Sequence, residues 1–162
     1  MSPGDSTVLF RALPAKLHLL AQERRNLRAF ARKLSKEIAD GNSFTCLITS
    51  DAELRDLNRT FRGHDYPTDV LSFPLADGSD TLGDLAISAE RASSQASELG
   101  HALTAELKIL MLHGLLHLRG MDHETDCGEM ARTERKWREA LRLPPSLTER
   151  ASASADRARR SA

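Results

Sequence analysis

Three histidines with the spacing of metal ligands stand near the middle of the chain. His113 and His117 are four positions apart, so on a helix their imidazoles project from one face, one turn apart. Gly120 follows, and a glycine just past a helix end readily takes the left-handed conformation that reverses the chain. That reversal would carry His123 back toward the first two rings. Three neutral imidazoles converging on one ion form an open zinc site, which predicts one Zn²⁺ per chain.

The residues around the first two histidines predict a buried helix. They are apolar on nearly every side: Leu107, Ile109, Leu110, Met111, Leu112, Leu115, Leu116 and Leu118. Core histidines that hydrogen-bond to the backbone are the structural alternative. A third histidine after a glycine turn argues against that alternative.

The histidine spacing is that of the extended zincin signature, H-E-x-x-H-x-x-G-x-x-H, with one change. Gly114 stands where a zinc peptidase has its general-base glutamate. We therefore expect a metal site that does not act as a standard peptidase. Two neighbours leave alternatives open. Cys127 is a fourth ligand or a free thiol, and Asp122 orients a ligand ring, accepts a proton or caps the turn.

A second cluster of functional side chains lies at a helix-to-loop junction upstream. Arg59, Arg62 and His64 gather there, directly before an apolar strand. Cations are favoured at a helix C-terminus by the helix dipole, which offers a purely structural role. A planar guanidinium also matches a phosphate in two-point geometry. The spacing alone leaves both interpretations open.

Charge is unevenly distributed along a chain whose formal net charge is zero. Residues 1–64 carry 11 basic and 7 acidic residues, residues 65–130 carry 3 and 12, and residues 131–162 carry 9 and 4. Two basic segments therefore flank an acidic centre. They would form a basic surface suited to a nucleic acid if they meet in space, and solvated helix faces are the alternative.

Nothing in the sequence has the features of a signal peptide, and no apolar run approaches membrane-spanning length. Cys46 and Cys127 are far apart in sequence, so no disulfide framework and no disulfide partner is expected. These features predict a cytoplasmic, reduced protein without a membrane partner.

Apolar periodicity predicts an α/β (α+β) fold, with a small mixed β-sheet of about four strands packed with about five to six helices. The expected strands are Ser6–Leu13, Phe44–Thr49, Thr68–Pro74 and Thr81–Ser88. Residues 1–147 are expected to form a single domain. The Ala/Ser/Arg-rich tail, residues 148–162, has almost nothing to bury and is expected to be disordered.

The helices are expected between these strands and after the last of them. The first is Lys16–Asp40, as one helix or two. The second runs from the N-cap Ser50 to about Phe61 and the third from the N-cap Ser88 to about Leu99, and the histidine helix and Glu124–Leu143 follow. Ser50 and Glu53 predict a capping box for the second, Ser88 caps the third, and Thr104 is expected to cap the histidine helix.

Three segments together resemble the YbeY family of endoribonucleases, over roughly Phe44 to Trp137. They are Asn58–Pro74, Leu82–Ser88 and the histidine run His113–His123. The resemblance implies a single-domain α/β fold, a zinc held by three histidines and cleavage of single-stranded RNA. It further implies ribosomal RNA maturation, notably at the small-subunit 3′ end, and ribosome quality control. The implied partners are ribosomal RNA, the small ribosomal subunit and its assembly proteins.

The resemblance also assigns roles to individual residues. Arg62 and His113 fall on positions that matter for activity in the family and are the expected catalytic residues. Arg62, Arg59 and His64 are expected to bind substrate. The chain departs from the family at His64, where lysine is usual, and at Met121, where tyrosine is common. Near pH 7 a histidine contacts phosphate less reliably than a lysine, so RNA affinity or substrate preference is expected to differ.

Two other functions fit parts of the sequence. A zinc hydrolase acting on a small molecule or peptide is disfavoured by Gly114 and by Arg62 as a phosphate clamp. A ribosome-assembly binding factor with a structural zinc would need a fourth protein ligand, such as Cys127 or Asp122. An open coordination position would favour catalysis.

Overall fold

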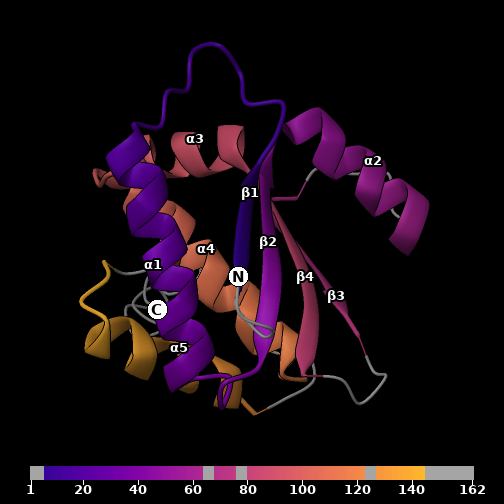
Figure 1. Ribbon diagram of the computed structural model, residues 1–162, viewed down its shortest axis with the longest axis vertical. Coiled ribbons are helices and arrows are strands. Elements are labelled where there is room, and N and C mark those ends of the chain that lie inside the picture. Colours follow the sequence, from indigo (N-terminus) through magenta and orange to yellow (C-terminus); the bar gives the residue numbers. More distant parts are fainter. Residues whose placement is uncertain (1–5, 64–67, 76–79, 123–126, 145–162) are drawn as a thin grey trace, which may run out of the picture.

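The computed structural model describes residues 6–63, 68–75, 80–122 and 127–144 and has a four-stranded mixed sheet at its centre (Figure 1). The strands are β1 (Thr7–Phe10), β2 (Ser43–Thr49), β3 (Val70–Pro74) and β4 (Thr81–Ser88). They lie in the order β1-β2-β4-β3; β1, β2 and β4 run parallel, and β3 pairs antiparallel with β4. The predicted small mixed sheet is confirmed, and β3 forms one of its two edges.

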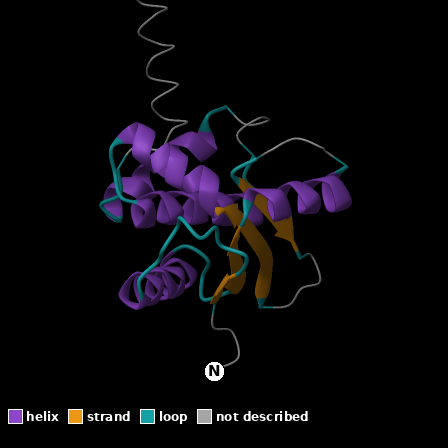
Figure 2. Ribbon diagram, turned by 90° about the horizontal axis from the view of Figure 1, so that it is seen from above, coloured by secondary structure: helices purple, strands orange, loops and turns teal. Residues whose placement is uncertain are grey.

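The described residues form five helices. They are α1 (Ala21–Glu37), α2 (Asp51–Arg62), α3 (Ala89–Leu99), α4 (Leu103–Leu118) and α5 (Glu129–Ala140). In Figure 1, α1, α4 and α5 gather on one side of the strands, whereas α2 lies on the other. Seen from above, most of the helices again lie to one side of the strands (Figure 2). The α/β fold predicted from the sequence is therefore confirmed.

The sheet separates two apolar cores because side chains alternate between its faces. On β4, Leu85 and Ile87 belong to the larger core, which also holds buried residues of α1, α4 and α5. Ala86, between them, belongs to a smaller core with Leu71 of β3 and Leu54 of α2. The strand β3 is thus sandwiched between α4 on one face and α2 on the other.

The histidine helix α4 is buried as predicted, but it begins differently. Its N-cap is Ala102, with no side-chain cap, so the predicted Thr104 cap is wrong and Thr104 lies in the first turn. Glu106 in that turn points inward, is 1% exposed and bonds His101 Nε2 at 2.5 Å. A buried acidic partner for His101, rather than a capping hydroxyl, marks this end of the helix.

Other helix boundaries also differ from the expectation. The Lys16–Asp40 segment is one helix that starts only at Ala21, where the Glu23 carboxylate accepts from Leu20 N–H at 2.9 Å. The helix expected to begin at Glu124 starts, in the described residues, at Glu129, and residues 124–126 lie outside the described ranges. The tail, residues 148–162, also lies outside them, so its expected disorder stays a prediction. The single domain expected over residues 1–147 stays a prediction.

The predicted capping box of α2 is only half formed. Ser50 Oγ accepts from Glu53 N–H at 3.2 Å, as expected. The Glu53 carboxylate turns instead to the Arg11 guanidinium and the Thr49 hydroxyl. The hydrogen bond from Arg11, followed by that from Thr49, lowers the pKa of Glu53. At α3, Ser88 Oγ accepts from Arg91 N–H at 3.1 Å, which confirms the predicted cap.

Replacing Gly83 with alanine is expected to destabilise the fold by at least about 3 kcal/mol. Gly83 has φ +141°, and a Cβ there would lie 2.2 Å from the carbonyl oxygen of Phe73, which is backbone of the paired strand β3. Gly41→Ala is the matched control: it has φ +83° but meets nothing within 4 Å, so its loss should be about 1–2 kcal/mol. Chemical denaturation measures both, and equal losses would contradict the clash.

None of the helices in the described ranges combines the length and apolar character needed to cross a membrane.

Candidate functional site

Two of the predicted metal ligands face each other on α4. The Nε2 atoms of His113 and His117 lie 3.2 Å apart, and the ring centroids are 4.8 Å apart with an interplanar angle of 73°. Two imidazole nitrogens bound to one tetrahedral Zn²⁺ at about 2.0–2.1 Å would stand about 3.3 Å apart. The pair therefore has the separation that a shared zinc ion requires.

The ring of His113 is oriented by a carboxylate from α5. Its Nδ1 lies 3.0 Å from Oε2 of Glu134, and the two side chains are 17% and 7% exposed. An ionised carboxylate only accepts hydrogen bonds, so Nδ1 carries a hydrogen, and Nε2 is the ring nitrogen left to bind a metal when the ring is neutral. Carboxylate partners of this kind fix the tautomer and orientation of metal-binding histidines.

Charge around His113 favours its protonated form. Burial acts to lower the pKa of His113, but the hydrogen bond and charge of Glu134, together with the charge of Asp69, outweigh it and raise the pKa. The same negative surroundings would attract a divalent cation to the ring nitrogen.

The chain reverses after α4 as the sequence predicts. Gly120 has φ +89°, its N–H donates to His117 O at 2.9 Å, and Met121 N–H donates to Leu116 O at 3.1 Å. His123 and His64 lie outside the described residues. Within the ranges that are described, no group of three or more His, Cys, Asp or Glu side chains could hold a metal ion.

The two candidate fourth ligands are both in described positions. Asp122 directly follows the glycine turn, and Cys127 is a free, exposed thiol. Neither forms a ligand group of three with His113 and His117 in the described part of the chain.

Gly114 lies where α4 packs against side chains of β3 and β4. A Cβ at this position would lie 2.8 Å from Cδ2 of Leu85 and 3.2 Å from Cγ2 of Val70. The glutamate of a zinc peptidase would need the space that these core side chains fill. Packing against β3 and β4 thus accounts for the residue that replaces the peptidase general base.

Arg62, the last residue of α2, reaches the open edge of β3. Its Nη1 donates to Ser72 O at 3.2 Å. Leu75 N–H bonds Leu82 O on β4, and groups along an antiparallel strand alternate, so the Ser72 carbonyl points away from β4. The Ser72 hydroxyl in turn donates to Gly114 O at 3.1 Å. This chain of bonds links the guanidinium to the residue beside His113.

Arg59, which was expected to bind substrate together with Arg62, is placed differently. Its Nη2 donates to Asp56 Oδ1 at 2.8 Å, in an exposed pair three residues apart on α2. Exposed pairs of this kind contribute little to stability. The structure therefore brings Arg62, rather than Arg59, against the edge strand, and the substrate-binding role of Arg59 stays a prediction.

Glu134 is the site residue that the sequence analysis missed. The final helix reads as charged, and its glutamates look alike in sequence. One signal was present: Glu134 follows Met130 by four residues, which places it on the same helix face. Met130 is fully buried and Glu134 is 5% exposed. A carboxylate on the core-facing side of a helix needs a buried partner, here His113.

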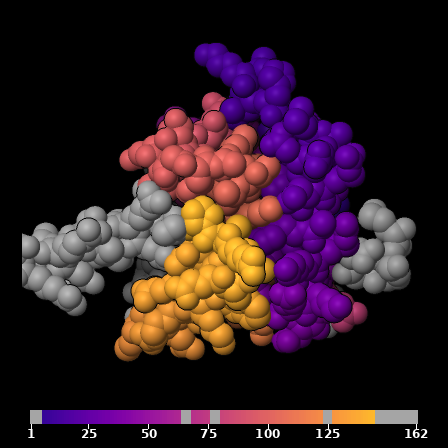
Figure 3. Space-filling view, turned by 90° about the vertical axis from the view of Figure 1, so that its left-hand side faces the viewer, coloured from indigo at the N-terminus to yellow at the C-terminus, as the bar shows by residue number. Residues whose placement is uncertain are grey.

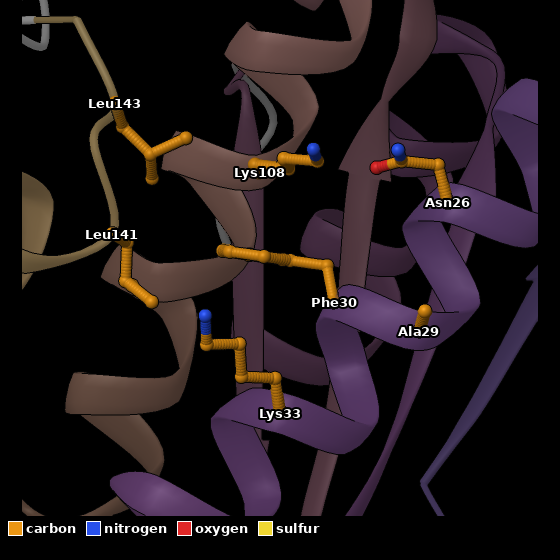
Figure 4. Close-up of a pocket in the computed structure, with 7 residues that line it drawn as sticks. All are labelled: Asn26, Ala29, Phe30, Lys33, Lys108, Leu141 and Leu143. Atoms are coloured by element: carbon orange, nitrogen blue, oxygen red, sulfur yellow. The ribbon is translucent and has the colours of Figure 1, made fainter.

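A separate cavity of about 270 Å³ lies between α1, α4 and the segment after α5 (Figure 4). It is lined by Asn26, Ala29, Phe30, Lys33, Lys108, Leu141 and Leu143. Figure 3 shows this face, where the yellow segment after α5 lies beside the indigo α1. Lys108 precedes His113 by five residues, about 140° around the helix, so the cavity opens away from the histidine pair.

Fold and site together define a mixed α/β protein with a histidine pair suited to a metal and an arginine at the neighbouring sheet edge. A sequence model of the family described as "Endoribonuclease YbeY" matches residues 15–142. The chain belongs to the endoribonuclease YbeY family, which confirms the resemblance predicted from its motifs.

Relatives and a solved structure agree with this assignment. "Endoribonuclease YbeY" of Solibacter usitatus is 58% identical over 149 residues, 92% of this chain and 97% of that protein. "Endoribonuclease YbeY" of Koribacter versatilis is 47% identical over 144 residues, 88% and 93% of the two chains. The solution structure of a Thermotoga maritima protein is similar, with a TM-score of 0.54 and 30% identity, over 80% of this chain and 85% of that one.

Proposed function

We propose that this chain is a zinc-dependent endoribonuclease that cleaves single-stranded RNA during ribosomal RNA maturation. Family membership makes it an endoribonuclease, a hydrolase whose substrate is RNA. The further parts of the proposal are processing of the small-subunit 3′ end, ribosome quality control, a cytoplasmic location, and the small subunit and its assembly proteins as partners. The facing Nε2 atoms of His113 and His117, 3.2 Å apart, carry the proposal of a metal-dependent mechanism.

The residues proposed to hold Zn²⁺ are His113, His117 and His123. The observed pair fits the ion in separation and in the tautomer that Glu134 imposes on His113. When bound, the ion supplies positive charge that polarises a phosphoryl oxygen or a water. Glu134 keeps the His113 ring fixed and its Nδ1 protonated, so that the ring does not turn away from the shared position.

Arg62 is proposed to hold the scissile phosphate. A guanidinium has five N–H donors in a planar fork, and its bond to Ser72 O uses one of them. The other donors can take two phosphate oxygens at once and stabilise charge that develops on them during cleavage. Arg59 and His64 are proposed to contact neighbouring phosphates. Both belong to the same stretch of chain at the end of α2.

Glu134→Ala is expected to weaken zinc binding by about 10- to 100-fold, because the His113 ring loses the group that orients it. Glu134→Gln keeps a carbonyl oxygen that accepts from Nδ1–H, so it should restore most of the affinity. Zinc affinity is measured by competition with a chromophoric chelator, independently of cleavage. Glu139→Ala, at an exposed position of the same helix, is the control. If Glu134→Ala and Glu139→Ala bind zinc equally well, Glu134 does not orient His113.

The proposed function is tested by metal analysis of the purified chain paired with cleavage of a single-stranded oligoribonucleotide. Cleavage should stop when a chelator removes the metal and return when Zn²⁺ is restored. A metal that stays bound while no RNA is cut would instead support a structural zinc in a ribosome-assembly factor. Cleavage that continues unchanged after complete metal removal would refute the metal-dependent mechanism.

A further inference from the structure

Phe61 stands out on the surface of α2. Its side chain is 68% exposed, more than any other large apolar side chain in the described residues. It is the residue directly before Arg62, in the last turn of α2, and this end of α2 stands clear of the other helices in Figure 1. A single exposed apolar residue needs no explanation by itself, so the inference depends on what surrounds this ring.

The ring of Phe61 packs against an aromatic side chain of β3. It meets the ring of Phe73 with centroids 5.8 Å apart and an interplanar angle of 73°, an edge-to-face contact. Phe73 in turn packs against the smaller core with Leu54 and Leu71. An edge-to-face contact uses the edge of one ring and one face of the other. Phe73 therefore supports the Phe61 ring, and at least one face of the Phe61 ring stays exposed to solvent.

The exposed ring of Phe61 lies next to Arg62, the residue proposed to hold the phosphate. Phe61 rests on Phe73 and Arg62 bonds Ser72, and these are consecutive residues of the edge strand β3. Ser72 continues to Gly114, next to His113. One short piece of β3 thus supports an aromatic face and a guanidinium, and it leads on to the histidine pair.

We propose that Phe61 is a stacking platform for an unpaired base of the RNA, next to the phosphate that Arg62 holds. Every base has a π-face, so such a platform accepts any sequence, whereas the bases of a duplex are already stacked on each other. The platform gives the site its preference for single strands. Arg62, the next residue of the same helix, supplies positive charge of the kind that an RNA backbone requires. The inference rests on the proposed function.

The first test compares cleavage of a single-stranded oligoribonucleotide by three variants of the full chain. Phe61→Ala should lower kcat/KM by about 5- to 100-fold, mainly through KM, because stacking is lost. Phe61→Trp should retain cleavage within about threefold, and Phe61→Leu, which is apolar but has no π-face, should behave like Phe61→Ala. Leu20→Ala is the matched control, since Leu20 is 66% exposed and lies at the start of α1.

The second test uses substrates that each lack one base. At one position the missing base should lower cleavage by the wild-type chain yet cause no further loss with Phe61→Ala. A merely structural role would lower cleavage of every substrate alike, without such a position. Zinc content and thermal unfolding are measured for every variant, so that folding defects are recognised. If Phe61→Ala is misfolded, the kcat/KM values of Phe61→Leu and Phe61→Trp are compared instead. Lower kcat/KM for Phe61→Leu than for Phe61→Trp supports the platform, and equal values contradict it.

Two results would overturn the platform. One is wild-type cleavage by Phe61→Leu, and the other is an equal loss on all abasic substrates, which would fit a merely structural role for Phe61 instead. Failure of the proposed function looks different, because the wild-type chain itself would then cut no RNA.

Discussion

Replacing His117 with alanine is expected to abolish zinc binding and RNA cleavage together. The variant removes one ring of the facing pair, so His113 Nε2 loses the second ring nitrogen that lies 3.2 Å away. Loss of a direct ligand should cost more than the roughly 10- to 100-fold expected for an orienting residue, so zinc affinity should fall by well over about 100-fold. Cleavage should fall to background, because the charge that polarises the phosphate is gone.

Stability provides a second measure of the same change. A ligand that binds the folded chain raises its unfolding temperature, so added Zn²⁺ should stabilise the wild type but not His117→Ala. Metal analysis after dialysis, thermal unfolding with and without Zn²⁺, and oligonucleotide cleavage are the measurements. His18→Ala, at an exposed position before α1, is the control and should behave as wild type. Wild-type zinc affinity in His117→Ala would exclude His117 as a ligand.

Arg62→Ala is expected to separate the two halves of the site. It should keep zinc at wild-type affinity while kcat/KM for single-stranded RNA falls by about 10²- to 10³-fold, the usual cost of removing a group that stabilises developing charge. Arg62→Lys should recover only part of this loss, since an ammonium is a point charge and lacks the planar fork. Cleavage kinetics and a zinc-affinity measurement on the same preparations check the result.

The control for Arg62 must also lose a positive charge. Arg91 is a suitable control residue because it lies on α3 and its Nε pairs with Asp51 Oδ1 at 2.8 Å. Asp51 is the first residue of α2, at the opposite end of that helix from Arg62. Arg91→Ala should leave cleavage near the wild-type level, which separates a local phosphate contact from a general change in net charge. Undiminished cleavage by Arg62→Ala would remove Arg62 from the mechanism.

The sequence predicted the parts of the site that depend on local geometry. The four-residue spacing of His113 and His117 determines that their rings share a helix face, and Gly120 adopts the positive φ that its position suggested. Both follow from backbone periodicity and from the conformational freedom of glycine. The apolar residues around the pair likewise predicted a buried helix, and α4 is one.

The parts that the sequence left open depend on tertiary contacts. Glu134 lies 21 residues after His113, and only the packing of α5 against α4 joins them. The sequence singled out Arg62 but did not show its contact, which depends on the register of β3, because that register turns the Ser72 carbonyl away from β4 to where Arg62 meets it. The Thr104 cap was wrong for a local reason, since α4 begins at Leu103, one residue before Thr104, with Ala102 as an N-cap that has no side-chain hydrogen bond. No short-range pattern encodes the contacts of Glu134 with His113 and of Arg62 with Ser72.

X-ray absorption at the zinc edge, on the full chain reconstituted with Zn²⁺, tests the central claim most directly. Three imidazoles and an open position predict only nitrogen and oxygen scatterers at about 2.0–2.1 Å, with the multiple scattering of histidine rings, and one imidazole fewer in His123→Ala. A sulfur scatterer at about 2.3 Å would instead indicate a cysteine ligand and a closed, structural site. An unchanged spectrum for His123→Ala would contradict the three-histidine site.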